Sequence, residues 1–483
     1  MTFLTGSTVT STTISRRVAL RAVAVLCLTA ASTTVLAACG GSGSKTSSTA
    51  AAQTGTARSS GTVTTAAHTA GAAASSSTVA PVNRHGAKLQ ILVGIDTAGF
   101  KLADQVAAAW KAKHPDISVS WVYDPAADNP DKILTMFAGG DPPDVFAIFP
   151  APLVVFADKG VLQPLDPLVK QGHYSLSDYW PASITMFTWK GILYGLPRGF
   201  ANNPGYVNLD AFKARGLPAP PVDFKDTTWT FDHITQMAKE LTKTANGRTT
   251  RYGTSIQTDL RDSWGPIVWS NGGEWFNADM TACTVTGTPA VEALQWLQDL
   301  IHKYQVAPRP DQAAWFGGAL NMFVAGQIGF YTYSGAWLKQ TRAAKFNWDY
   351  CVTPRGAKGT VVGGGGVAWS IAKVTKDLGD AWLLLQHVAS AQSQKLLSTV
   401  FYPGRKSAAE YLAALNPNLP PKHRQLPIDA MDYVRTDPVH PRWSEINTVI
   451  TNQLSYLWNG SRSAKEVAAQ IKAGVDPILQ GKV

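Results

Sequence analysis

KILTMFAGGDPPDVF, residues 132–146, contains the signals for a helix, a tight turn and a buried strand in succession. Apolar residues such as Ile133 and Phe137 have the spacing of one helical face. The pattern stops at Gly139-Gly140, and glycine at such a point lets the backbone turn left-handed and leave the helix. The first part of this segment therefore predicts a helix that ends at the two glycines.

The second part of the segment predicts a turn followed by a strand. Asp141-Pro142-Pro143-Asp144 disfavours helix, because a residue that precedes proline is pushed towards extended geometry. Val145–Phe149 is a short, continuous apolar run of the kind found in buried strands of parallel sheets. Asp141 is thus held at a turn, where it either faces a ligand or, on the simpler interpretation, only turns the chain.

Residues 89–123 repeat this order of elements. Leu89–Ile95 predicts a strand, residues 102–110 have helical apolar spacing, and Ile117–Tyr123 predicts a second strand. Alternating strands and helices predict a parallel sheet with right-handed crossovers, in which ligands bind at the carboxyl ends of the strands. We expect Asp96 and Asp141 at such ends, although Asp96 is equally well explained as a helix cap.

The rest of the chain continues this mixture of helices and strands. With about 400 residues after residue 86, the body is too long for a single hydrophobic core, which predicts two lobes. Apolar spacing predicts further helices over residues 234–241, 289–302, 380–390, 443–458 and 464–473.

The beginning of the chain has the features of an export signal over residues 1–38. Arg16-Arg17 precedes a run of alanine, valine and leucine that ends at Leu36–Cys39. Because these last residues resemble a bacterial lipobox, we expect cleavage before Cys39 and lipidation of its thiol. The arginine pair also resembles a twin-arginine signal, but alanine stands where that motif prefers a bulky apolar residue, so the export route stays open. A plain transmembrane helix is the competing interpretation.

Residues 39–86 predict a disordered tether. They are almost wholly glycine, serine, threonine and alanine, with no aromatic residue, leucine, isoleucine or acid. Such a segment cannot bury enough apolar surface to offset its conformational entropy. A flexible chain of this length has a root-mean-square reach of about 40 Å. We therefore expect it to hold a folded body away from a membrane.

Charge and cysteine content exclude several classes of protein. The formal net charge is +10, but residues 1–86 hold six basic residues and no acid, so the body carries +4. Without clustered lysine and arginine, nucleic acid is not an expected partner. The body contains Cys283 and Cys351, which either form one disulfide or pack as isolated thiols. No metal-site spacing is present, and neither a metal nor another cofactor is expected.

Aromatic residues are the strongest indication of a ligand, since sixteen tryptophans exceed what core packing usually needs. A pyranose ring has a face of C–H bonds and a rim of hydroxyls. Its site therefore needs flat rings for stacking and planar polar groups for paired hydrogen bonds. Packing in the core is the competing explanation for each ring. The stacking candidates are Trp264, Trp269, Tyr333 and Trp337, and the hydrogen-bonding candidates are Asp96, Asp141 and Arg405.

In their order along the chain, these segments resemble the family 1 extracellular solute-binding proteins, which are the carbohydrate-binding lipoproteins of ABC importers. The resemblance covers nearly all of the chain after about residue 88. Besides residues 132–146, it is carried by Ala157–Asp166, Tyr194–Arg198, Asn271–Gly273, Met322–Trp337 and Gly363–Gly366.

The resemblance also implies roles for single residues. In this family a Gly-x-Trp segment after a strand commonly lays its indole against the sugar, which favours Trp337 as a ligand contact. Pro403-Gly404-Arg405 resembles the family's Pro-x-Arg segment near the cleft. The glycine run around Gly365 lacks the spacing of a phosphate-binding loop, so we interpret it as a crossing between lobes where backbone amides approach the ligand.

The implied architecture is the α/β periplasmic-binding-protein type II fold, with two lobes of parallel-type sheets around a hinge and a ligand cleft. We expect lobe 1 to comprise residues 87–200 and 364–403, and lobe 2 residues 201–363 and 404–483. Closure of the lobes would bury a small carbohydrate without catalysis. The closed monomer would then dock on ABC permease subunits at the outer face of the bacterial cytoplasmic membrane.

Two other functions remain open at the level of sequence. A secreted glycan-degrading enzyme would also use aromatic walls, with two carboxylates across the scissile bond, and Asp96 and Asp141 are the available pair. A binding protein for a non-sugar solute such as a polyamine would need more acids around its rings.

Overall fold

The computed structural model describes residues 87–97, 99–125, 130–332 and 334–483, so the predicted signal peptide, the tether and Cys39 lie outside the described residues. The segment 132–146 has its predicted form. Helix α2 (Pro130–Ala138) is followed by Gly140, whose φ of 76° is left-handed. The N–H of Asp141 then donates to the carbonyl of Met136 at 3.2 Å, which closes the helix end. Strand β3 (Val145–Ile148) is buried throughout.

A mixed sheet carries the first part of the fold. Its order is β15-β14-β3-β1-β2, and β6 also pairs with β14. β1 is parallel to both β2 and β3, as predicted, whereas β14 is antiparallel to β3 and to β6. The strands are β1 (Lys88–Gly94), β2 (Ser118–Asp124), β3, β6 (Leu196–Asn202), β14 (Val362–Ile371) and β15 (Val434–Thr436).

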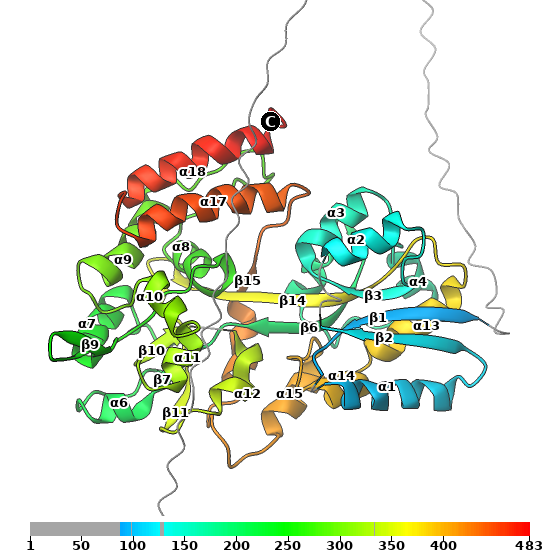
Figure 1. Cartoon of the computed structure of the whole chain (residues 1–483), viewed down its shortest axis with the longest axis horizontal. Helices are drawn as coiled ribbons and strands as arrows, with labels where there is room; N and C mark the ends of the chain where they lie inside the picture. The colour runs from blue at the N-terminus through cyan, green and yellow to red at the C-terminus, as the bar shows by residue number, and fades with distance from the viewer. Residues whose placement is uncertain (1–86, 98, 126–129, 333) are drawn as a thin grey trace, which may run out of the picture. The chain divides into compact units, whose positions relative to one another are not determined.

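Strand β14 links distant parts of this sheet. Its end at Ala368–Ile371 pairs with β3, and its beginning at Val362–Gly364 pairs with β15. β6 accompanies it over Gly364–Trp369, so the two strands run side by side across the middle of the body (Figure 1). The run Gly363–Gly366 therefore lies inside a strand.

The second sheet differs from the expected parallel type. It is formed by β7 (Gly205–Asn208), β10 (Phe330–Thr332) and β11 (Trp348–Cys351), and both β10 and β11 are antiparallel to β7. Three short hairpins complete the strands: β4 (Thr188–Trp189) with β5 (Ile192–Leu193), β8 (Lys243–Ala245) with β9 (Arg248–Arg251), and β12 (Arg355–Gly356) with β13 (Gly359–Thr360).

Helices begin at recognisable sequence signals. The hydroxyl of Ser463 accepts the N–H of Glu466, and the Glu466 carboxylate accepts the N–H of Ser463, which makes a capping box. Beyond α2, the helices are α1 (Phe100–Lys113), α3 (Pro150–Asp158), α4 (Asp166–Gln171), α5 (Pro181–Met186), α6 (Leu209–Lys213), α7 (Phe231–Leu241), η1 (Leu260–Trp264), α8 (Gly265–Ser270), α9 (Thr288–His302), α10 (Pro310–Trp315), α11 (Ala319–Val324), η2 (Gly335–Trp337), α12 (Leu338–Thr341), α13 (Leu378–Val388), α14 (Ala391–Leu397), α15 (Lys406–Ala414), α16 (Leu426–Asp429), η3 (Ala430–Tyr433), α17 (Trp443–Trp458) and α18 (Ala464–Leu479).

Buried apolar side chains form three clusters. The first surrounds β1, β3 and the helices α1, α3 and α13. The second joins α8 and α9 to α17 and α18, and the third surrounds β7, β10 and β11. Ala409 and Met431 return to the first cluster although they follow residue 403, where the first lobe was expected to end. The chain therefore contributes to the first cluster beyond that predicted boundary.

The two cysteines of the body are isolated thiols. Cys283 is buried in the second cluster and Cys351 in the third, and neither forms a disulfide. Burial raises the pKa of the Cys283 thiol to about 11 and that of Cys351 well above its usual value. Within the described ranges, no group of His, Cys, Asp or Glu side chains could hold a metal ion, and no helix is both long and apolar enough to cross a membrane.

Candidate ligand-binding cleft

A pocket of about 280 Å³ lies at the carboxyl ends of β1 and β3. The register pairs Leu92 with Phe146, so the two strands end at the same edge of the sheet. Phe149 follows β3 at this edge and lines the pocket. Arg198 from β6 also lines it, and its Nη1 donates to the carbonyl of Gly94 at 3.0 Å.

Two exposed aromatic side chains face this pocket. The Trp337 side chain is 40% exposed and that of Phe149 is 39% exposed, although both are large and apolar. The turn that carries Trp337 is closed by Ser334, whose carbonyl accepts the Trp337 N–H at 3.2 Å. Its hydroxyl accepts the N–H of Ala336 at 3.3 Å. The indole is therefore presented from an ordered turn rather than packed in a core.

Arg198 supports the sheet side of the pocket. Its guanidinium lies 4.1 Å from the ring centre of Phe401 and 5.4 Å from that of Trp369, and the residue is only 5% exposed. The two rings hold the planar guanidinium in one orientation, so its hydrogen bond to the backbone costs little additional side-chain entropy. Arg198 thereby holds the end of β1, through Gly94, next to the ligand space.

The glycines of β14 are required by Arg261. A Cβ atom at Gly365 would lie 2.5 Å from Nη1 of Arg261, and one at Gly363 would collide with the Arg261 carbonyl oxygen. A Cβ at Gly366 would collide with the backbone of Gly199. Arg261 and Gly365 both line the pocket. The space freed by the glycines is thus occupied by Arg261 and β6, and the predicted approach of Gly365 to a ligand stays a prediction.

Asp96 and Asp141 are not brought together. Asp96 follows β1 at the pocket edge and is exposed, and its Oδ1 accepts the N–H of Gly99 at 2.9 Å, as a capping residue would. Asp141 precedes β3, which is parallel to β1, so it lies at the opposite edge of the sheet. Both residues were expected at the carboxyl ends of strands. This expectation is wrong for Asp141, because it lies in the turn before β3 and therefore at the amino end of that strand.

Arg405 is buried and is not among the residues that line the pocket. Its Nε donates to the carbonyl of Ala389 at 2.7 Å, and its Nη1 contacts a carboxylate oxygen of Asp178 at 3.1 Å. The ring of Tyr179 lies 4.3 Å from the guanidinium. These partners direct the side chain away from the cleft, so the predicted role of Arg405 in ligand binding is corrected to a structural one.

Trp264 and Trp269 also belong to the protein interior. Trp264 is 1% exposed, its Nε1 donates to the carbonyl of Thr258 at 3.0 Å, and its ring centre lies 4.0 Å from that of Trp275. Trp269 is buried, and the guanidinium of Arg435 lies 4.5 Å from its ring centre. Neither lines the pocket at the strand ends, because both helical turns face the second cluster. The predicted stacking roles are replaced by core packing.

Of the residues predicted for the ligand site, Trp337 and Gly365 line this pocket, and their contact with a ligand stays a prediction. Tyr333 lies outside the described residues. Sequence reasoning did not single out Phe149, Arg198 or Arg261. Phe149 was included in the preceding strand, and its place directly after a buried apolar run was the signal available for it.

Comparison with known proteins agrees with this arrangement. A family model described as bacterial extracellular solute-binding protein matches residues 95–395. A putative binding protein of Brucella abortus is 25% identical over 398 residues, which are 78% of this chain and 89% of that protein.

Two solved structures show the same fold. An ABC substrate-binding protein of Listeria monocytogenes in complex with cycloalternan has a TM-score of 0.70 and 22% identity, covering 82% of this chain and 99% of that one. The sugar-binding protein MalE of Xanthomonas citri also has a TM-score of 0.70, with 19% identity and coverage of 82% and 98%. The predicted type II periplasmic-binding-protein fold is confirmed, and the chain belongs to the family of bacterial extracellular solute-binding proteins.

Proposed function

We propose that this protein captures a small carbohydrate in the cleft and delivers it to an ABC permease. The observation that carries the proposal is the 40% exposed indole of Trp337 at a pocket that also contains the exposed ring of Phe149. An exposed aromatic face costs hydration free energy unless a ligand covers it, and the C–H face of a sugar fits such a ring. The similar structures of the Listeria protein, a complex with cycloalternan, and of the sugar-binding Xanthomonas protein support the same ligand class.

Capture would proceed by closure of two lobes, predicted as residues 87–200 with 364–403 and residues 201–363 with 404–483, with Ala409 and Met431 packing against the first of them. The pocket takes Phe149 and Arg198 from the first set and Arg261 and Trp337 from the second, so closure would tighten both walls around a ligand. The paired strands β6 and β14 pass between the sets and are the natural hinge. Such a cycle requires no catalysis, and the separation of Asp96 from Asp141 removes the carboxylate pair considered for a glycan-degrading enzyme.

The first prediction concerns the ligand class. A neutral or acidic mono- or oligosaccharide should raise the thermal midpoint of the protein, because a ligand that binds only the native state stabilises it by RT ln(1 + [L]/Kd), about 2.7 kcal/mol at a hundredfold excess over Kd. A thermal-shift panel of sugars measures this, with spermidine as the polyamine control and chromatography of the incubated sugar as the test for hydrolysis. Stabilisation by spermidine alone, or release of product, would refute the proposal.

We also propose that the mature protein is a monomeric lipoprotein on the outer face of the bacterial cytoplasmic membrane. The support is the sequence Leu36-Ala37-Ala38-Cys39 together with the low-complexity segment 40–86 that follows it. Acyl chains contribute about 0.8 kcal/mol per buried methylene, so two or more chains on Cys39 would give stable anchoring.

The second prediction tests the anchor. Cys39→Ser should move the protein from the membrane fraction to the soluble fraction, because serine offers no thiol for lipidation. Its ligand affinity should stay unchanged, since the described cleft is built from residues after 148. Fractionation followed by immunoblotting measures the first effect, and Cys27→Ser is the matched control that should stay membrane-bound. Retention of the Cys39→Ser variant in the membrane would count against the lipoprotein assignment.

A further inference from the structure

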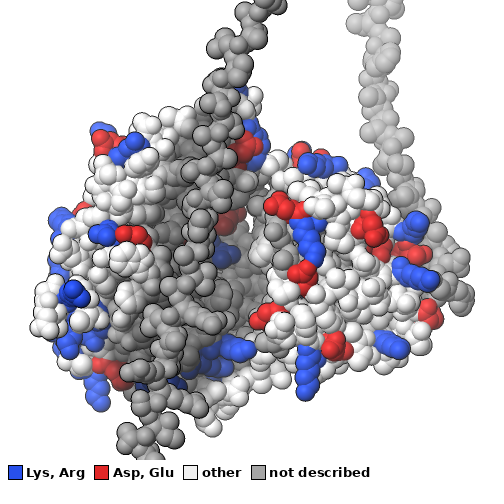
Figure 2. Space-filling view, viewed as in Figure 1, with Lys and Arg blue, Asp and Glu red and all other residues white. Residues whose placement is uncertain are grey.

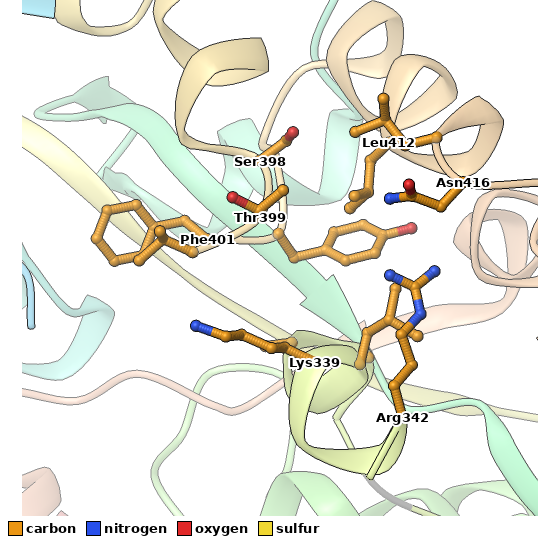
Figure 3. Close-up of a pocket in the computed structure, with 13 residues that line it drawn as sticks. Lys339, Arg342, Ser398, Thr399, Phe401, Leu412 and Asn416 are labelled. Carbon is orange, nitrogen blue, oxygen red and sulfur yellow. The ribbon is translucent and has the colours of Figure 1, made fainter. Parts of the chain in front are cut away.

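A second pocket, of about 240 Å³, adjoins the cleft. It shares Ala336, Val400, Phe401 and Tyr402 with the pocket that contains Trp337. Figure 3 shows that Lys339 and Arg342 enter it from one side, with Lys339 extending below Phe401. A ligand whose ring lies on Trp337 would therefore have this second pocket beside it.

Basic side chains line both pockets. Lys339 and Arg342 line the second pocket and Arg198 and Arg261 the first, and among the residues that the structure describes no aspartate or glutamate lines either one. Lys339 lies in α12 and Arg342 directly follows this helix, and Figure 3 shows Lys339 extending toward Phe401 and Arg342 toward Leu412 and Asn416. Figure 2 shows basic side chains at the lower end of the hollow, where Figure 1 places α12.

Lys339 and Arg342 have no anionic partner among the described residues. Among the described residues, no salt bridge involves Lys339 or Arg342, and the Arg342 Nε donates instead to the neutral carbonyl of Pro420 at 2.9 Å. Burial lowers the pKa of Arg342, whereas Tyr350 acts in the opposite direction and the positive charge of Arg424 adds a smaller lowering. A guanidinium that is partly desolvated and faces a second cation is stabilised by any anion placed against it.

Neutral donors complete the second pocket. Thr399 lines it from the segment that follows α14, and Asn416 lines it just beyond the end of α15 (Figure 3), whereas the hydroxyl of Ser398 already donates to the carbonyl of Lys395 at 2.8 Å. Hydroxyl and amide groups can donate to the oxygens of a carboxylate or phosphate, whereas a cationic ligand would meet like charge in this pocket. The composition therefore favours an anion and disfavours a polyamine.

We infer that the solute carries an anionic group, a carboxylate or a phosphate, which binds against Lys339 and Arg342 while its sugar ring lies on Trp337. This inference rests on the proposed function as a carbohydrate-binding protein and narrows its ligand to acidic sugars. A uronic acid carries a carboxylate and a sugar phosphate carries a phosphate, and both groups present negatively charged oxygens. The experiment must therefore distinguish these two kinds of acidic sugar.

The experiment compares matched pairs of probes by titration calorimetry on the purified protein. Glucuronate and galacturonate are set against glucose and galactose, glucose 6-phosphate is set against glucose, and glycerol 3-phosphate is an anion without a sugar ring. The acidic member of at least one sugar pair should bind about tenfold more tightly than its neutral parent. That difference should shrink as salt is raised, because screening weakens the charge pair.

Lys339→Gln tests the position of the anion. It should lower the affinity for the acidic sugar about tenfold and leave the affinity for its neutral parent unchanged. Lys345→Gln is the matched control, because Lys345 is exposed shortly after α12 and lines neither pocket. It should leave both affinities unchanged.

The outcomes separate this inference from the proposed function. If the neutral sugars bind as tightly as the acidic ones or more tightly, the inference is overturned and carbohydrate capture still stands. The same conclusion follows if Lys339→Gln changes the affinities for acidic and neutral sugars equally. Binding of glycerol 3-phosphate without any sugar supports an anion site and overturns the carbohydrate ligand. Failure of every acidic probe to bind overturns the inference.

Discussion

Trp264→Ala is expected to lower the free energy of unfolding by about 3–5 kcal/mol, the usual cost of removing a large aromatic side chain from a packed core. The residue is almost fully buried, and its ring packs edge-on against Trp275. The substitution leaves a cavity and also deprives the Thr258 carbonyl of its hydrogen-bond donor. Denaturant unfolding of the purified protein measures the loss as a lower midpoint.

Two variants control for this effect. Trp315→Ala removes the same side chain from a position that is 87% exposed, and it should change the unfolding free energy by less than about 0.5 kcal/mol. Trp264→Phe keeps an aromatic ring but loses the indole donor, so its cost should fall between the two. Near-wild-type stability of Trp264→Ala combined with lost sugar affinity would return Trp264 to the ligand site and contradict its assignment to the core.

Trp337→Ala is expected to show the opposite pattern. Because the indole is substantially exposed and lines the pocket, its removal should weaken binding of the sugar found in the thermal-shift panel by about 1–3 kcal/mol, or roughly 5- to 150-fold. The unfolding free energy should change little, since few core contacts are lost. Titration calorimetry and denaturant unfolding on one preparation measure both quantities.

The exposed Trp315 again provides the matched control, because it lies outside the pocket and its replacement should leave sugar affinity unchanged. Trp337→Phe should recover part of the affinity, since a phenyl ring still offers a stacking face. The stacking role of Trp337 would be contradicted by unchanged affinity in Trp337→Ala, and a loss of stability as large as that of Trp264→Ala would place the residue in the core.

Local signals in the sequence were sufficient for several elements but not for β14, because its glycine run was interpreted as a crossing between lobes. The helix, glycine turn and strand of residues 132–146 occur as predicted, and α17 spans the predicted residues 443–458. Apolar spacing, glycine ends and proline turns act over one or two turns of chain. The position of Asp141 was also readable from chain order, because a residue that precedes a strand lies at that strand's amino end.

The pairing of strands and the burial of individual side chains, in contrast, depend on contacts between residues far apart in the chain. The sequence does not distinguish Trp264 from Trp337, which are the same residue type and both lie near a glycine. Arg405 and Arg198 likewise differ only through their partners: Arg405 is buried against Asp178, whereas Arg198 lines the pocket. Composition and the family resemblance could indicate a ring-lined site without selecting its members.

The sequence by itself determined several helices and strands, the parallel pairing of β1 with β2 and β3, and the family, because helix and turn signals are short-range and the strand–helix alternation restricts how those strands connect. Only the tertiary structure decided that the glycine run lies in a strand antiparallel to β3 and β6, and that Trp337 and Lys339 line two adjoining pockets. These features depend on contacts between distant segments, and such contacts leave no periodic pattern in the local sequence.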